Sequence, residues 1–148
     1  MKYFTKEYIR EADCKEVQDL RKELRPFDFI CDSEPNNLVF YMERLVSKCL
    51  QFVSPMFLHE INEHRKSYTW LPTGDQLDEE IVKICKKREI VYIFRFNPFV
   101  VKNKYRVETE GETTEEILTK WSYNKSDNPL IAKIKLLKQL LEVNNANK

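Results

Sequence analysis

The string His59-Glu60-Ile61-Asn62-Glu63-His64 is the first place where the side-chain types suggest catalysis. A zinc-binding H-E-x-x-H helix carries its two histidines four residues apart, so that both project from one face. Here the histidines are five residues apart, which rotates them by about 140° around a helix. The spacing favours a charged, solvated end of a short helix within residues 56–66. We therefore expect no metal or other cofactor.

Cysteine provides the other candidate nucleophiles, because the chain contains Cys14, Cys31, Cys49 and Cys85. Their wide and irregular spacing, without a C-x-x-C pair, is typical of free thiols in a reducing compartment. Cys31 beside Asp32 is the least implausible nucleophile, but a buried structural thiol is the simpler interpretation. A small enzyme with a Cys/His or carboxylate site is therefore an alternative that the sequence disfavours.

Glycine is scarce in this chain, which contains only Gly74 and Gly111. Walker A loops and dinucleotide-binding fingerprints need clustered glycines, because backbone N–H groups must approach phosphate closely. The sequence therefore excludes the common nucleotide-binding loops. Both glycines lie instead at predicted helix entries, which shifts the expectation from catalysis toward surface recognition.

Residues 83–106 carry an uneven charge, with eight basic residues and a single acid, Glu89. Aromatic residues are interleaved with these cations. Cations that meet phosphates beside rings that stack on bases are the components of a single-strand-binding sheet. The candidate surface for nucleic acid or another partner consists of Arg95, Lys102, Lys104, Arg106, Tyr92, Phe94 and Tyr105. Half-buried aromatics behind a solvated cationic face are the simpler interpretation, because the RNP1 consensus is absent.

Capped helices are the first elements that must position these residues. Residues 5–24 indicate two helical pieces, the second capped by Asp13 with Glu16 as its capping-box partner. Thr73 begins a second capping box, which predicts a helix over residues 74–88. Acids at the start of this helix and bases at its end complement the helix dipole.

Strand-forming residues gather between residues 90 and 109. Residues 90–96 are β-branched and aromatic, and residues 99–101 and 104–109 are expected to form two further strands. Residues 27–31 are another candidate strand. Because helices outnumber strands, the predicted fold class is α+β, with a small antiparallel sheet covered by several helices.

Three further segments are predicted to be helical. An apolar stripe over four turns predicts a helix at residues 38–53, although residues 38–42 alone would pass for a buried strand. Residues 113–121 are expected to form a capped helix, and a strongly apolar helix is expected to start at Pro129 and to fray over residues 144–148. Core packing is the default for this last helix, and a homodimer formed through it is the alternative.

Length and composition limit the class of protein. The 148 residues include 25 basic and 24 acidic side chains, so the net charge of the chain is too small to attract polyanions. From the length and composition we expect one soluble domain over residues 1–148. No apolar run approaches the ~20 residues of a membrane span. The N-terminus lacks the apolar region of a secretory signal. The sequence therefore predicts a cytoplasmic protein without a membrane partner.

Two short segments carry a resemblance to known proteins: Ala12-Asp13-Cys14-Lys15-Glu16-Val17-Gln18 and Trp70-Leu71-Pro72-Thr73-Gly74-Asp75-Gln76-Leu77. In this order they resemble the "ADC-x-E-x-Q" and "WLP-x-x-DQL" segments of small uncharacterised proteins encoded by bacteriophages and prophages. The resemblance implies a phage origin, the host bacterial cytoplasm as location and an unknown activity, and it assigns no catalytic residue. We expect a non-enzymatic accessory protein that binds a host macromolecule. A host protein is the suspected partner, in host takeover or counter-defence.

Overall fold

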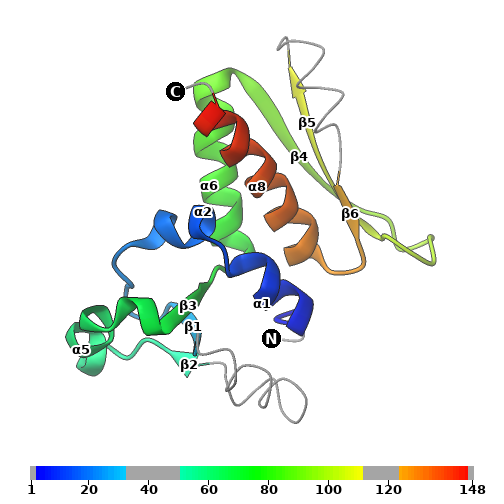
Figure 1. Ribbon diagram of the computed structural model, residues 1–148. Helices are drawn as coiled ribbons and strands as arrows, with labels where there is room; N and C mark the ends of the chain where they lie inside the picture. The colour runs from blue at the N-terminus through cyan, green and yellow to red at the C-terminus, as the bar shows by residue number, and fades with distance from the viewer. Residues whose placement is uncertain (1–2, 33–50, 112–123, 147–148) are drawn as a thin grey trace. The chain divides into compact units, whose positions relative to one another are not determined.

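The computed structural model describes residues 3–32, 51–111 and 124–146 (Figure 1). The chain divides into two compact units, residues 1–73 and 74–148. Each unit combines helices with a three-stranded antiparallel sheet. The fold class is therefore α+β, as predicted, with the strands distributed over two sheets.

The first unit begins with α1 (Lys6–Ala12), α2 (Lys15–Gln18) and the 3-10 turn η1 (Asp19–Arg21). The Thr5 side chain accepts a hydrogen bond from the backbone N–H of Tyr8 and so caps α1. The predicted cap of the second piece by Asp13 is wrong, because Cys14 occupies the N-cap position of α2. Asp13 instead ends α1, and its carboxylate accepts a 3.3 Å hydrogen bond from the Thr69 hydroxyl.

The sheet of the first unit has β1 (Phe29–Asp32) at its centre, between β2 (Gln51–Phe52) and β3 (Tyr68–Leu71). β1 confirms the candidate strand at 27–31 with a shift toward higher numbers. The helix predicted over residues 38–53 is wrong at its end, because residues 51–52 pair with β1. Pairing with a strand far along the chain overrides a local helical stripe. The rest of that prediction lies outside the described residues.

A short helical stretch connects β2 to β3. It consists of η2 (Pro55–Phe57), α5 (Leu58–Glu63) and η3 (Arg65–Ser67), which confirms the short helix predicted within residues 56–66. The core of this unit contains the buried side chains of Tyr8, Val17, Leu24, Ile30, Trp70 and Leu71. The buried Tyr8 hydroxyl donates a 2.5 Å hydrogen bond to the carbonyl oxygen of Pro72.

The second unit consists of α6 (Gly74–Arg88), β4 (Ile90–Phe96), β5 (Tyr105–Gly111), β6 (Asn124–Ser126) and α8 (Pro129–Ala146). α6 and β4 confirm the predictions for residues 74–88 and 90–96. Glu89 joins them with a φ of 57°, the left-handed conformation that commonly ends a helix. The strand order is β4-β5-β6, and α8 packs against α6, β5 and β6.

The strand predicted at residues 99–101 is wrong, because residues 97–104 form the turn between β4 and β5. In Figure 1 this yellow-green turn lies at the end of β4 and β5 and points away from α6 and α8. Asparagine and proline at the start of the turn favour chain reversal over continued pairing. The helix predicted at residues 113–121 lies outside the described residues.

The final helix α8 starts at Pro129, where the helix was predicted to begin. The Asn128 side chain caps it by accepting a 2.9 Å hydrogen bond from the backbone N–H of Leu130. The helix extends to Ala146, which is within the segment for which fraying was predicted. Its buried apolar residues are Leu130, Ile131, Ala132, Ile134, Leu136, Leu137 and Leu140. Among the described residues, no helix is both long enough and apolar enough to cross a membrane.

Candidate functional site

Strand alternation separates the predicted aromatic residues from the predicted arginines. In the β4–β5 ladder Arg95 lies opposite Arg106, and Phe96 lies opposite Tyr105. Successive side chains of a strand point to opposite faces of the sheet. Arg95 and Arg106 therefore share one face, while Tyr92 and the other aromatic residues of the ladder share the other face.

The aromatic face contacts the helices of its own unit. The Lys133 ammonium of α8 lies 4.3 Å from the centroid of the Phe94 ring and 3.0 Å from a carboxylate oxygen of Asp78 in α6. The Tyr92 hydroxyl donates a 2.8 Å hydrogen bond to the same carboxylate, and burial raises the pKa of this phenol. Tyr92 and Phe94 therefore have internal partners that a stacked base would have to displace.

Tyr105 also contacts other aromatic side chains on this face. Its ring stacks on Phe94 and Phe96, with ring centroids 5.9 and 4.9 Å away. Such stacked pairs stabilise a sheet beyond the area that they bury. The three aromatic residues proposed from the sequence are thus brought together, but they serve the packing of the sheet.

The opposite face carries a carboxylate between two arginines. Glu108 is buried and forms ion pairs with Arg106 of the same strand and with Arg95 of β4, the latter at 3.8 Å. Both arginine side chains remain substantially exposed. One negative charge therefore holds two guanidinium groups at the surface and neutralises part of their charge.

The four predicted cations line one cavity of about 380 Å³ at the turn end of the β4–β5 hairpin. We call it the basic cavity; its polar lining is formed by Arg95, Asn97, Lys102, Asn103, Lys104 and Arg106. Among the residues that the structure describes, no hydrogen-bond or ion-pair partner contacts the ammonium groups of Lys102 and Lys104. Several cations around one hollow with a single buried carboxylate attract anionic groups.

The backbone of residues 97–104 fixes the position of these lysines. The N–H of Asn97 donates a 2.9 Å hydrogen bond to the Lys104 carbonyl oxygen, which closes the hairpin. Asn103 adopts a φ of 57°, a conformation that asparagine tolerates well. The N–H of Lys104 donates a 3.3 Å hydrogen bond to the Asp127 carboxylate, which ties the turn to the residues before α8.

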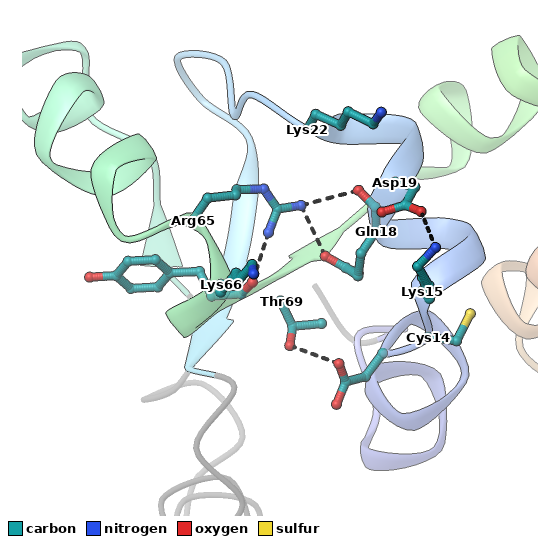
Figure 2. A pocket seen from close by; sticks show the side chains of 10 residues that line it. Cys14, Lys15, Gln18, Asp19, Lys22, Arg65, Lys66 and Thr69 are labelled. Atoms are coloured by element: carbon teal, nitrogen blue, oxygen red, sulfur yellow. Dashed lines mark hydrogen bonds and ion pairs between the residues drawn. The ribbon is translucent and has the colours of Figure 1, made fainter.

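A larger cavity of about 550 Å³ lies in the first unit, where α2 faces the segment from Arg65 to Thr69 (Figure 2). Figure 2 shows Cys14 and Lys15 on one side and Arg65 on the other. Lys15 forms an exposed ion pair with Asp19 at 3.4 Å.

Arg65 is one of the cations that line this cavity, but its N–H groups donate hydrogen bonds to the protein itself. Its guanidinium donates to the carbonyl oxygens of Arg21 and Tyr68, at 2.8–3.0 Å, and to the Gln18 side chain at 3.1 Å. Gln18 in turn accepts a 2.7 Å hydrogen bond from the N–H of Trp70. Desolvation lowers the pKa of Arg65. The arrangement fastens α2 and η1 to β3 and leaves this guanidinium little capacity for a ligand.

The histidines from the sequence hypothesis lie at the surface. The exposed His59 ring contacts Glu63 at 2.9 Å, and His64 shares a cavity of about 420 Å³ with Glu60, Glu63 and Ser54. The Ser54 hydroxyl caps η2 by accepting from the N–H of Met56, and no hydrogen bond joins it to His64 within the described residues. Nucleophilic catalysis needs that contact between nucleophile and base.

The described cysteines form no disulfide, and the described part of the chain contains no group of three or more His, Cys, Asp or Glu side chains that could hold a metal ion. Cys31 and Cys85 are buried, and desolvation raises the pKa of Cys85 to about 11. A buried thiol that stays protonated is a poor nucleophile. Cys14 is half-buried beside the first-unit cavity.

No known protein family, curated protein or solved structure matches this chain. The resemblance to phage-encoded proteins therefore stays a prediction. The basic cavity is the candidate site, because it gathers the four predicted cations, and the ammonium groups of two of them contact no hydrogen-bond or ion-pair partner among the described residues. The sequence hypothesis placed the binding surface on the sheet and did not predict that the turn contributes to the site. The turn-forming residues Asn97-Pro98 and Asn103 could have indicated it.

Proposed function

We propose that this protein is a non-enzymatic accessory protein of the phage type, and that the host macromolecule it binds is a nucleic acid. The observation that carries the proposal is the basic cavity, where Lys102 and Lys104 lie beside Arg95 and Arg106. The resemblance of residues 12–18 and 70–77 to phage-encoded proteins supports a target in the host cytoplasm.

Charge is the reason to prefer nucleic acid over an uncharged partner. A protein gains affinity for a nucleic-acid strand from each lysine or arginine that neutralises a phosphate, because the condensed counterions of that phosphate are released. The basic cavity has four cations, and Glu108 compensates one unit of charge at Arg95 and Arg106. The two lysines are available to phosphates without the loss of a described ion pair. Phosphate contacts of this kind hold a strand without reading its sequence.

The test is fluorescence anisotropy of a short labelled thymidine oligonucleotide at salt concentrations from about 25 to 200 mM. We expect the parent protein to bind with an affinity that falls as salt rises. The double variant Lys102→Ala/Lys104→Ala should bind more weakly, and its salt slope should be smaller by about 1.4, or about 0.7 for each lost contact with a single strand.

The matched control is Lys86→Ala/Lys87→Ala, which removes the same charge from exposed lysines in the last turn of α6. These lysines lie just before the first residue of β4, whereas the basic cavity lies at the other end of this strand, so about 20 Å of strand separates the two sites. Equal weakening by both double variants would show a diffuse charge effect and contradict the cavity as the site. Binding to phosphatidylserine vesicles or an acidic protein, with none to the oligonucleotide, would overturn the proposal.

A further inference from the structure

The turn that builds the basic cavity also presents apolar side chains to solvent. Phe99 is 94% exposed and Val101 is 88% exposed, while Val100 between them lines the cavity. A single exposed apolar side chain at a turn lowers the stability of a protein very little. Here, however, an almost fully exposed phenylalanine ring lies in the same turn as a cavity lined by four cations. The ring and the cations together match a ligand with both phosphates and flat apolar faces.

The position of Phe99 follows from a local hydrogen bond. The backbone N–H of Phe99 donates a 3.0 Å hydrogen bond to the side-chain oxygen of Asn97, which itself lines the cavity. Phe99 thus lies between two lining residues along the chain, Asn97 and Val100. The main-chain bond between Asn97 and Lys104 closes the base of the same turn. The aromatic ring and the lysines therefore belong to one small, hydrogen-bonded structure.

We infer that Phe99 stacks on an unpaired base while the basic cavity holds the adjoining phosphates, so that the ligand is single-stranded. The inference rests on the proposed nucleic-acid function and moves the stacking group from the sheet face to the turn. Tyr92, Phe94 and Tyr105 have partners in the sheet and helices, whereas Phe99 exposes nearly its whole ring. Stacking on an aromatic ring is independent of sequence because every base has a π-face.

A duplex lacks the feature that this turn would recognise. Its bases are stacked on one another, so a ring reaches a base face only where a step is opened, and opening costs a few kcal/mol per step. An unpaired strand offers its base faces without that cost. Cation and ring together therefore favour single strands, whereas the lysines alone would accept any polyanion.

The experiment compares two labelled probes, a thymidine strand and an abasic strand of the same length, which has the phosphates but no bases. For Phe99→Ala we expect the dissociation constant of the thymidine strand to rise roughly 10-fold or more. The affinity for the abasic strand should stay the same. Val101→Ala is the control, because it trims a similarly exposed apolar residue of the same turn without removing a π-face.

A second variant gives a spectroscopic readout of stacking. Phe99→Trp should retain binding, and the thymidine strand should quench its fluorescence, measured as a difference from the parent protein that contains Trp70 and Trp121. Absence of that quenching despite binding would contradict stacking.

The outcomes separate this inference from the proposed function. Equal weakening of both probes by Phe99→Ala, similar losses with Val101→Ala, or tighter binding to duplex than to single strand would overturn the stacking role and leave backbone binding by the lysines in place. Failure of the parent protein to bind either probe would overturn both.

Discussion

Glu108 connects the stability of the hairpin to the charge of the basic cavity. Its carboxylate is buried between Arg95 and Arg106, and both arginines also line the cavity. A buried carboxylate is tolerated because the paired cations compensate the cost of its desolvation. The same pairing reduces the charge that the arginines can offer to an anion.

We therefore expect Glu108→Gln to have two effects of opposite sign. The free energy of unfolding should fall by about 1–3 kcal/mol, because two arginines lose their counter-charge. Affinity for the thymidine oligonucleotide should rise roughly threefold or more, since each released guanidinium can meet a phosphate. Urea unfolding and fluorescence anisotropy measure the two effects. Weaker binding by this variant would show that Glu108 holds the arginines in position for the nucleic acid and does not compete with its phosphates for them.

Arg65 shows why a residue type alone does not identify a binding site. It lies in the largest of the described cavities, yet its guanidinium bonds to backbone oxygens of Arg21 and Tyr68 and to the side chain of Gln18. Gln18 and Arg65 are 47 positions apart in the chain, so no local pattern links them. By contrast, the separation of Phe94 from Arg95 across the sheet follows from alternation along one strand and could have been predicted from the sequence.

At the scale of elements, α8 holds the second unit together. Leu136, Leu137 and Leu140 are fully buried, and the helix packs against α6 and the sheet. Truncation of a buried leucine removes transfer energy and leaves a cavity. The alternative for this helix, a homodimer, would instead need its apolar side chains at an interface between chains.

These alternatives give different outcomes for Leu137→Ala. We expect the free energy of unfolding to fall by about 2–5 kcal/mol, measured by urea denaturation. Glu142→Ala, on an exposed position of the same helix, should change it by no more than about 0.5 kcal/mol. If Leu137→Ala left stability unchanged and converted a dimer to the 17.9 kDa monomer in light scattering, the core role of this residue would be contradicted.

Elements were predictable where local pattern and tertiary contacts agree. The helix at 74–88 has an acidic first turn, a basic last turn and a buried apolar stripe. The strand at 90–96 consists largely of the β-branched and aromatic residues that favour strands. The sequence interpretation failed at 51–52 and 99–101. At 51–52 a long-range pairing with β1 decides the structure, and at 99–101 apolar residues lie in an exposed turn. Apolar composition indicates burial only where the backbone can pair or pack.

For the whole molecule, charge placement matters more than total charge. The formal net charge is +1, so the protein has no long-range attraction for polyanions comparable to that of a basic nucleic-acid-binding domain. The structure places the four predicted cations around one cavity and the predicted aromatic residues on the opposite face of the sheet, and whether these residues bind a ligand stays a prediction. The convergence of the cations on one cavity depends on the β4–β5 register, which composition does not specify. The α+β class follows from element content alone, whereas the division into two units depends on contacts distant in the chain.

The exposed turn at residues 97–104 also has a consequence for proteolysis. Loop tips are preferred sites of nicking by proteases, and trypsin cleaves after lysine. We expect cleavage after Lys102 well before cleavage after Lys86 or Lys87, which lie in the regular helix α6. The ladder between β4 and β5 should hold the two fragments together in native gels, while mass spectrometry under denaturing conditions resolves them.

A bound strand should slow this cleavage, because it would cover the bond after Lys102. The time course of trypsin digestion with and without the thymidine oligonucleotide therefore maps the ligand onto the turn without any substitution in the protein. Protection at Lys86 and Lys87 instead of Lys102 would place the strand at the other end of β4. Lys102 would thus contact the nucleic acid, and the peptide bond that follows it would report, by resisting trypsin, that the strand is bound.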